Sequence, residues 1–140
     1  MFREISKGRM FGHPVHSMLV HFPTALYPFS LVMHLLGYYK GNPEFYLAAK
    51  YAIFGGIGMS IFAMVFGLIE AEQISNNSPR YRTALVHGGL NTLWFMGFLT
   101  ITYIDTSVQN MPTILCLSSI GNIGILVSNY LGGEVRRLND

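Results

Sequence analysis

The sequence predicts an all-α fold, an integral membrane bundle of four helices. Charged residues make up only 11% of the 140-residue chain and hydrophobic residues 51%, whereas about 25% charge is usual for a soluble domain. Asp, Glu, Lys and Arg are absent from four windows, residues 11–39, 51–69, 83–104 and 106–133. A membrane-spanning helix needs roughly 20 apolar residues, and lipid favours helices because every backbone group must be satisfied internally. This composition excludes a soluble nucleic-acid-binding protein.

The first helix is expected over residues 14–39. Pro14 suits a first helical position, where its missing N–H would have no partner. The breaker sequence Gly-Asn-Pro follows at residues 41–43. Pro23 and Pro28 each remove a backbone donor, so we expect kinks within this helix.

The other three helices are expected over residues 45–74, 80–104 and 111–134. Short connections separate them, at residues 75–79 (Ser-Asn-Asn-Ser-Pro) and around 105–112. Short connections make consecutive helices antiparallel neighbours. The sequence therefore predicts a single transmembrane domain over residues 1–140 with up-down-up-down topology.

Lysine and arginine are distributed unevenly between the two ends of this bundle. Most fall at the end that would hold both termini: Arg3, Lys7, Arg9, Arg80, Arg82, Arg136 and Arg137. The other end has Lys40 and Lys50. Because basic residues favour the cytoplasmic side of a membrane, both termini are predicted to be cytoplasmic.

Small residues recur on the second and fourth helices. On the fourth, Gly124, Ser128 and Gly132 follow one another at four-residue spacing. Such residues allow helices to approach closely in lipid. They either pack the bundle or form the interface of a homodimer.

Most of the histidines are expected near the cytoplasmic end, with His13, His16 and His21 at the start of the first helix and His87 in the third. His34 falls toward the opposite end and is interpreted as incidental. His21 and His87 each lie roughly 10 Å into helices that run in the same direction, at 1.5 Å per residue. Their imidazoles are therefore predicted to face each other at matched depth.

Three roles are open to these facing imidazoles. In the leading hypothesis, His21 and His87 ligate the iron of one b-type haem between the first and third helices. Arginines at the membrane surface then pair with the propionates, and the site includes Arg82 and Asn91, with Arg9 and Arg80 as further candidates. The second role is a transition-metal ion held by histidines, with Glu70 or Glu134 helping. The third is a proton-conducting or structural network without a cofactor.

Helical spacing limits these alternatives. His13 lies outside the helix if Pro14 is its first residue, and His21 falls on a different face from His16. A three-histidine site from the first helix alone is therefore disfavoured, although His13 and His16 remain alternative ligands. Ion pairs near the surface, which would fix the helix ends, are the simplest interpretation of Glu70, Arg82 and Glu134.

Four motifs along the chain resemble those of a known family. Residues 13–26 read H-P-V-H-S-M-L-V-H-F-P-T-A-L, residues 67–70 read G-L-I-E, residues 82–91 follow R-x-x-x-x-H-x-x-x-N, and residues 131–135 read L-G-G-E-V. In this order they resemble an uncharacterised bacterial family of four-helix membrane proteins, domain of unknown function 2231. Glu70 stands where the family more often has Asp, which keeps a carboxylate at that position.

The resemblance implies four helices in a bacterial inner membrane and does not itself supply a biochemical function. Some relatives are fused to Rieske-type or cytochrome c-type domains, which favours haem over a bare metal ion. Its motif positions are His13, His16, His21, Glu70, Arg82, His87, Asn91 and Glu134.

We therefore expect a small membrane cytochrome b-like subunit that passes electrons within a larger redox complex and has no catalytic activity of its own. Its partners would be the lipid bilayer and other membrane redox subunits, or a second copy of the chain. The alternatives are a structural or accessory subunit without a cofactor and a histidine-rich metal site.

Overall fold

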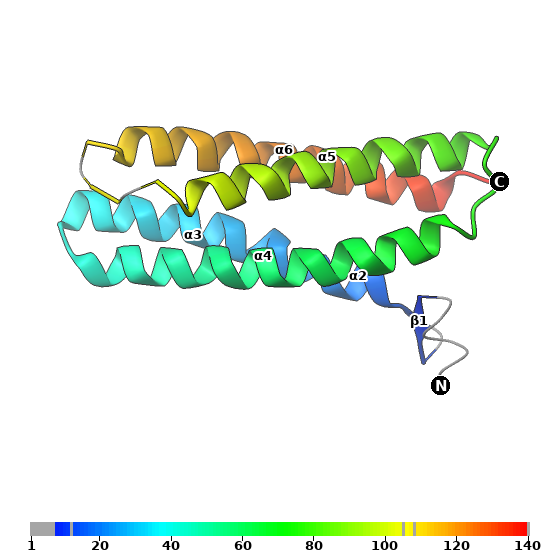
Figure 1. The fold of residues 1–140 in the computed structure, drawn as a ribbon, viewed down its shortest axis with the longest axis horizontal. Coiled ribbons are helices and arrows are strands. Elements are labelled where there is room, and N and C mark those ends of the chain that lie inside the picture. Colours follow the sequence, from blue (N-terminus) through cyan, green and yellow to red (C-terminus); the bar gives the residue numbers. More distant parts are fainter. Residues whose placement is uncertain (1–7, 12, 105, 108, 140) are drawn as a thin grey trace.

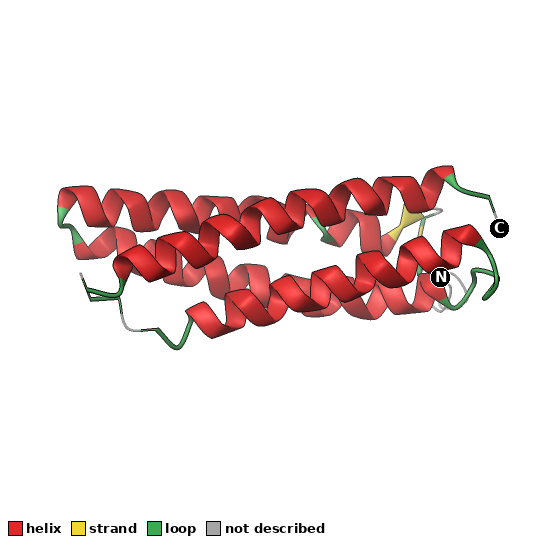
Figure 2. Cartoon of the chain, turned by 90° about the horizontal axis from the view of Figure 1, so that it is seen from above, coloured by secondary structure: helices red, strands yellow, loops and turns green. Residues whose placement is uncertain are grey.

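The computed structural model describes residues 8–11, 13–104, 106–107 and 109–139. In this part of the chain a short antiparallel ribbon of strands β1 (Arg9–Met10) and β2 (His13–Pro14) precedes the helices. The helices are α2 (Val15–Leu19), α3 (His21–Lys40), α4 (Pro43–Ala71), α5 (Pro79–Ile101) and α6 (Met111–Arg137), as labelled or coloured in Figure 1. The ribbon was not expected from the sequence, and Figure 2 shows it in yellow beside an otherwise helical chain.

Four helices are long and apolar enough to cross a membrane: α2 with α3 (Val15–Lys40), α4, α5 and α6. The predicted four-helix membrane fold is confirmed to this extent. Large apolar side chains cover the outside of the bundle, and Leu68, Ile123 and Leu126 are each more than 60% exposed. Lipid covers such surfaces without the cost that water would impose.

The first span is interrupted at Val20, between α2 and α3. Pro23 explains the position of this break, because it has no N–H to donate to the carbonyl of Leu19 and its ring would crowd that carbonyl. Pro28 lies inside α3 without ending it. Of the two prolines expected to distort this helix, Pro23 is therefore the one that coincides with an interruption.

Capping residues at the breaker sequences fix where α4 and α5 begin. The side chain of Asn42 accepts a hydrogen bond from the backbone N–H of Glu44 (2.9 Å), and that of Ser78 accepts one from Tyr81 (3.1 Å). In both helices proline follows the cap directly. These are the residue types that satisfy the first orphan N–H groups of a helix.

Three helix ends differ from the expected ranges by three residues. Helix α5 ends at Ile101 and not at residue 104. Helix α4 ends at Ala71, before residue 74, and α6 continues past residue 134 to Arg137. Arg137 donates to the carboxylate of Glu134 at 2.9 Å, one turn back. A basic residue in the last turn also complements the helix dipole, which supports the extension.

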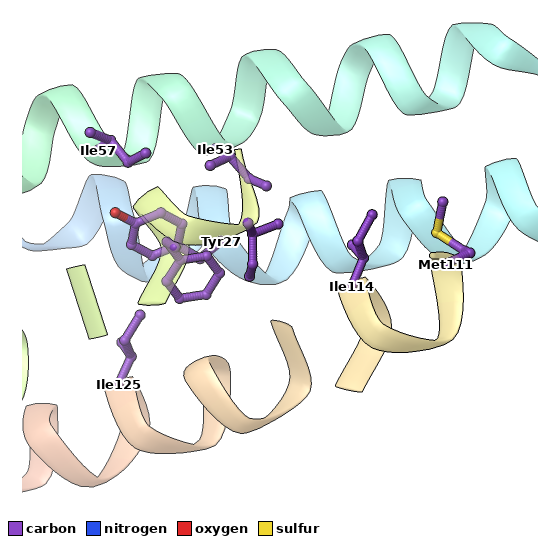
Figure 3. Close-up of a cluster of buried hydrophobic side chains, with 8 residues drawn as sticks. Tyr27, Ile53, Ile57, Met111, Ile114 and Ile125 are labelled. Carbon is purple, nitrogen blue, oxygen red and sulfur yellow. The ribbon is translucent and has the colours of Figure 1, made fainter. Parts of the chain in front are cut away.

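The helices pack as two hairpins. Helix α4 packs along α2 and α3 in the first hairpin, and α6 packs along α5 in the second (Figure 1). Packing is denser within each hairpin than between them. A cluster of buried side chains joins the two, and Figure 3 shows Tyr27 of α3 among isoleucines of α4 and α6.

Glycines of α4 and α6 make room for large side chains on the neighbouring helix. A Cβ atom at Gly56 would lie 2.6 Å from Tyr27, one at Gly121 would lie 2.9 Å from Phe98, and one at Gly124 would overlap the indole of Trp94. Ser128, on the same stripe, is fully buried. The small residues of the fourth helix therefore pack the bundle.

The two hairpins repeat the same pattern of contacts, a feature that did not stand out in the sequence. Tyr27 follows His16 by eleven residues, and Phe98 follows His87 by eleven. The Tyr27 and Phe98 rings stack with centroids 3.8 Å apart, and the two histidine rings are 6.0 Å apart. Because both pairs meet, the first and third spans run side by side in the same direction.

The partner helices repeat in the same way. Gly56 and Gly67 of α4 face Tyr27 and His16, and Gly121 and Gly132 of α6 face Phe98 and His87. Each pair of glycines is again separated by eleven residues. The bundle is therefore built from two equivalent halves that are related by an approximate two-fold axis along its length.

Candidate functional site

His16 is held in the first hairpin by the backbone of α4. Its Nδ1–H donates to the carbonyl oxygen of Ala63 at 2.7 Å. The ring lies on Gly67, four residues further along α4, where a Cβ atom would be only 3.0 Å from Nδ1. A glycine at this position therefore lets the imidazole reach the carbonyl.

His87 is held in the second hairpin by the equivalent part of α6. Its Nδ1–H donates to the carbonyl oxygen of Ser128 at 2.7 Å, and the Ser128 hydroxyl lies 3.2 Å from the same nitrogen. The ring lies on Gly132, four residues beyond Ser128, where a Cβ atom would be 2.9 Å from Cε1. Each half of the bundle thus supplies one imidazole, one carbonyl and one glycine.

The two rings meet between the hairpins. Their centroids are 6.0 Å apart and their planes are nearly perpendicular, at 85°. A carbonyl oxygen can only accept, so each Nδ1 must carry a proton. In the neutral imidazole the lone pair is then on Nε2, which is the tautomer that binds metals when a carbonyl fixes the other nitrogen.

Asn91 completes the surroundings of His87, one turn further along α5. Its side-chain nitrogen donates to the backbone carbonyl of His87 at 2.9 Å and lies 3.1 Å from Nε2 of the ring. The same nitrogen lies 3.3 Å from Nδ1, so Asn91 lies against both ring nitrogens, and the tautomer of His87 is assigned from its bond to Ser128 alone.

The structure corrects the expectation that His21 faces His87. His21 is the first residue of α3 and is exposed, and the ring that meets His87 is that of His16. The predicted depths were measured from the first residue of each helix. Helix α5 begins at Pro79, eight residues before His87, whereas α2 begins one residue before His16, so the two helices start at different levels.

The remaining histidines lie away from this pair. His13 is exposed in β2, where it is opposite Met10. His34, which was interpreted as incidental, is 2% exposed, packs near Tyr46 with centroids 6.5 Å apart, and has no partner at Nδ1. Burial of this kind was not anticipated for a residue assigned to the far end.

The predicted cluster of Glu70, Arg82 and Glu134 is divided in the structure. Glu134 pairs with Arg137, and Arg82 lies in the first turn of α5. Glu70 is half-buried beside the backbone of His16 and within the electrostatic influence of three arginines, Arg9, Arg80 and Arg136. Arg136, which also acts on His16, was not assigned to the site from sequence.

No metal-ion cluster is formed by the residues that the structure describes. Among them, no group of three or more His, Cys, Asp or Glu side chains lies close enough to share an ion. Two apolar cavities, of about 350 and 230 Å³, lie between α5 and α6 on either side of Trp94. Neither cavity is lined by a histidine.

Sequence reasoning missed the carbonyls of Ala63 and Ser128 and the glycines on which the rings lie. A backbone carbonyl that accepts a hydrogen bond cannot be recognised from the residue type, because every residue has a backbone carbonyl. The repeated spacing did carry a signal: an imidazole followed after eleven residues by an aromatic ring, and two glycines at the same interval on the next helix. This repeat would have selected His16 over His21.

Comparison with known proteins gives one family. No curated protein and no solved structure matches the chain. Residues 12–137 match the model of the family described as predicted membrane protein, domain of unknown function 2231, which covers the bundle and both histidines of the pair. The chain therefore belongs to this family of predicted membrane proteins.

Proposed function

We propose that this protein is a small haem-binding subunit of a membrane redox system, in which His16 and His87 would hold the iron. The observation that supports the proposal is the shared tautomer of the two rings. Each gives its Nδ1–H to a backbone carbonyl, which leaves the Nε2 lone pair for iron. The haem would supply one-electron transfer.

His16 and His87, whose ring centroids are 6.0 Å apart, would hold the iron together once the hairpins part to admit it. Asn91 would have to turn away from Nε2 of His87 to admit iron.

The porphyrin would lie between the two hairpins. Packing is less dense there than within each hairpin, and both rings are anchored within their own half. Parting the hairpins would therefore leave both hydrogen bonds to carbonyls intact. Arg9, Arg80 and Arg136, around Glu70, are placed to pair with propionates at the membrane surface.

The same hydrogen bonds favour a second candidate, a structural role. An imidazole that donates to the carbonyl of a neighbouring helix ties two helices together in lipid, where such bonds contribute about 1 kcal/mol. In this case the pair would hold the bundle without any cofactor, and the chain would be an accessory subunit.

An absorbance spectrum of the purified protein separates the two candidates. The haem proposal expects a Soret band that shifts on reduction, an α-band, and porphyrin that can be extracted. His16→Ala and His87→Ala should each lower the bound haem at least about tenfold, because each removes an iron ligand.

His21→Ala is the matched control, since it removes an exposed imidazole from the same span and should leave the spectrum unchanged. Wild-type protein without porphyrin would contradict the proposal. A loss of haem in His21→Ala but not in His16→Ala would restore the ligand pair expected from sequence.

We further propose that the four helices cross a bacterial inner membrane in alternating directions with both termini in the cytoplasm. The uneven placement of Lys and Arg supports this orientation. The electron donor and acceptor would then be other membrane subunits.

A further inference from the structure

The interface between α3 and α6 carries several polar groups in the middle of the apolar bundle. The side-chain nitrogen of Asn129 donates to the Thr24 hydroxyl at 3.0 Å, and that of Asn122 donates to the carbonyls of Ser118 (2.8 Å) and Tyr27 (3.4 Å). Ser30 and Ser118 are fully buried in the same region. We call these groups, from Thr24 and Asn129 to His34, the polar seam.

Three atoms of the polar seam lack a protein partner. They are Oδ1 of Asn122, Oγ of Ser118 and Nδ1 of His34, each fully enclosed. Polar atoms in a membrane interior are costly unless they are hydrogen-bonded. Buried groups of this kind are commonly satisfied by internal water.

The two-fold repeat supplies an internal comparison. At the equivalent positions in the other half of the bundle, counted from the paired histidines and paired glycines, six polar residues of the seam are replaced by apolar ones. The equivalent of His34 is Asp105, which lies outside the described residues. Thr24, Tyr27 and Ser30 correspond to Phe95, Phe98 and Ile101, and Ser118, Asn122 and Asn129 correspond to Ile53, Ile57 and Met64.

This comparison separates the needs of the fold from those of function. Ile53, Ile57, Phe98 and Ile101 belong to the buried core, so the same helix packing is achieved with apolar side chains. The polar residues are therefore not required to build the interface. Polar groups inside a membrane are costly, so their presence here indicates a functional role, such as binding water or moving protons.

We propose that the polar seam binds a chain of internal waters and relays protons along the bundle. Its hydroxyl, amide and imidazole groups would hold these waters by hydrogen bonds. A proton would enter at one end, each water would take a proton from one neighbour and give one of its own to the next, and a proton would leave at the other end. The relay is neutral in electrons and needs no co-reactant.

The two ends of the polar seam lie toward opposite ends of the bundle. Asn129 directly follows Ser128, whose carbonyl holds His87. His34 lies beside Tyr46, in the part of α3 that ends at Gly41. From Thr24 to His34 the seam follows α3 for about 15 Å at 1.5 Å per residue, roughly half of the hydrocarbon core.

Proton flux into liposomes tests this proposal. Purified protein is reconstituted into vesicles that contain a pH-sensitive dye, and a potassium diffusion potential with valinomycin drives protons inward. Acidification should be faster than in protein-free vesicles. Asn122→Leu, a near-isosteric change, should slow the protein-dependent rate about tenfold, because it removes a group that holds the waters of the lipid-enclosed path.

Ile57→Leu is the matched control at the equivalent position of α4 and should leave the rate unchanged. A wild-type rate equal to that of empty vesicles, or an unchanged rate in folded Asn122→Leu, would overturn the proposal. The outcome is independent of the haem spectrum, so proton flux in a protein without porphyrin would support the polar seam and contradict only the haem proposal.

A measurement on the wild-type protein covers the case in which Asn122→Leu does not fold. Water-edited solid-state nuclear magnetic resonance compares how fast magnetisation passes from water to each side chain. Ser118 and Asn122 should receive it faster than Ile53 and Ile57, which occupy the equivalent positions. Equal, slow transfer to all four would show a dry seam and exclude the relay.

Discussion

At the scale of single residues, the glycines of α4 and α6 determine which side chains can reach the centre of the bundle. Gly67 and Gly132 admit the two imidazoles, and Gly124 admits the indole of Trp94. At other glycines, such as Gly133, an added Cβ atom would meet nothing within 4 Å. The same residue type therefore has a steric role at some positions and none at others.

This difference predicts opposite effects for two substitutions on one helix. Gly124→Ala should destabilise the protein by about 1–3 kcal/mol, because the added methyl group overlaps Trp94 and forces the indole to move. Gly133→Ala should have no cost and even stabilise the helix by about 0.5 kcal/mol, since Ala is the better helix former.

Thermal unfolding of both variants in one detergent measures the contrast. A midpoint for Gly124→Ala at or above that of Gly133→Ala would contradict the packing described for Trp94.

The histidines show how far residue-level prediction reached. His87 and Asn91 were both identified from the pattern, and the structure brings them into contact. His16 was not identified as the partner of His87. Equal depth, counted from the start of each helix, is a poor guide when the helices start at different heights. The height at which each helix starts along the bundle is set by packing between helices, which cannot be read from a single sequence.

At the scale of elements, Pro23 explains the break between α2 and α3. Apolar length predicted the spans, and Asn42 and Ser78 lie at the breaker sequences that predicted the connections. A kink near Pro23 was expected from the sequence, whereas the strand ribbon was not.

Replacing Pro23 tests this role. Pro23→Ala restores an N–H that can donate to the carbonyl of Leu19, so the amides around residues 20–24 should exchange with deuterium more slowly than in the wild type. Pro28→Ala is the control, because Pro28 lies inside a continuous helix and is remote from the break.

Hydrogen exchange measured by mass spectrometry resolves this segment. Unchanged protection in Pro23→Ala would mean that the break has another cause, such as the contact between His16 and Ala63.

At the scale of the whole molecule, the ends of the bundle differ in charge. The connection between α4 and α5, the residues before α2 and the end of α6 carry arginines, and Lys40 lies at the opposite end, where Gly41 ends α3. The sequence could predict this asymmetry because it depends only on the order of charges and helices. The two-fold relation between the hairpins is harder to find in the sequence, since residue types differ at most equivalent positions and only the spacing of the paired rings and glycines repeats.

Reporter fusions test the proposed orientation. Alkaline phosphatase fused after residue 41 should be active, since it would be exported, and green fluorescent protein fused after residue 139 should fluoresce, because basic residues keep that end in the cytoplasm. The exchanged fusions are the controls and should both be inactive. Active phosphatase at the C-terminal position would reverse the orientation.

The anchoring of each imidazole within its own hairpin has a consequence for biosynthesis. Once Ala63 and Gly67 have followed His16 into the membrane, everything that holds the first ring is present, before α5 and α6 have been translated. When the second hairpin is inserted, its own residues Ser128 and Gly132 already hold the ring of His87. Assembly is thereby reduced to the docking of two finished halves, and the space between the imidazoles is the last part of the protein to close.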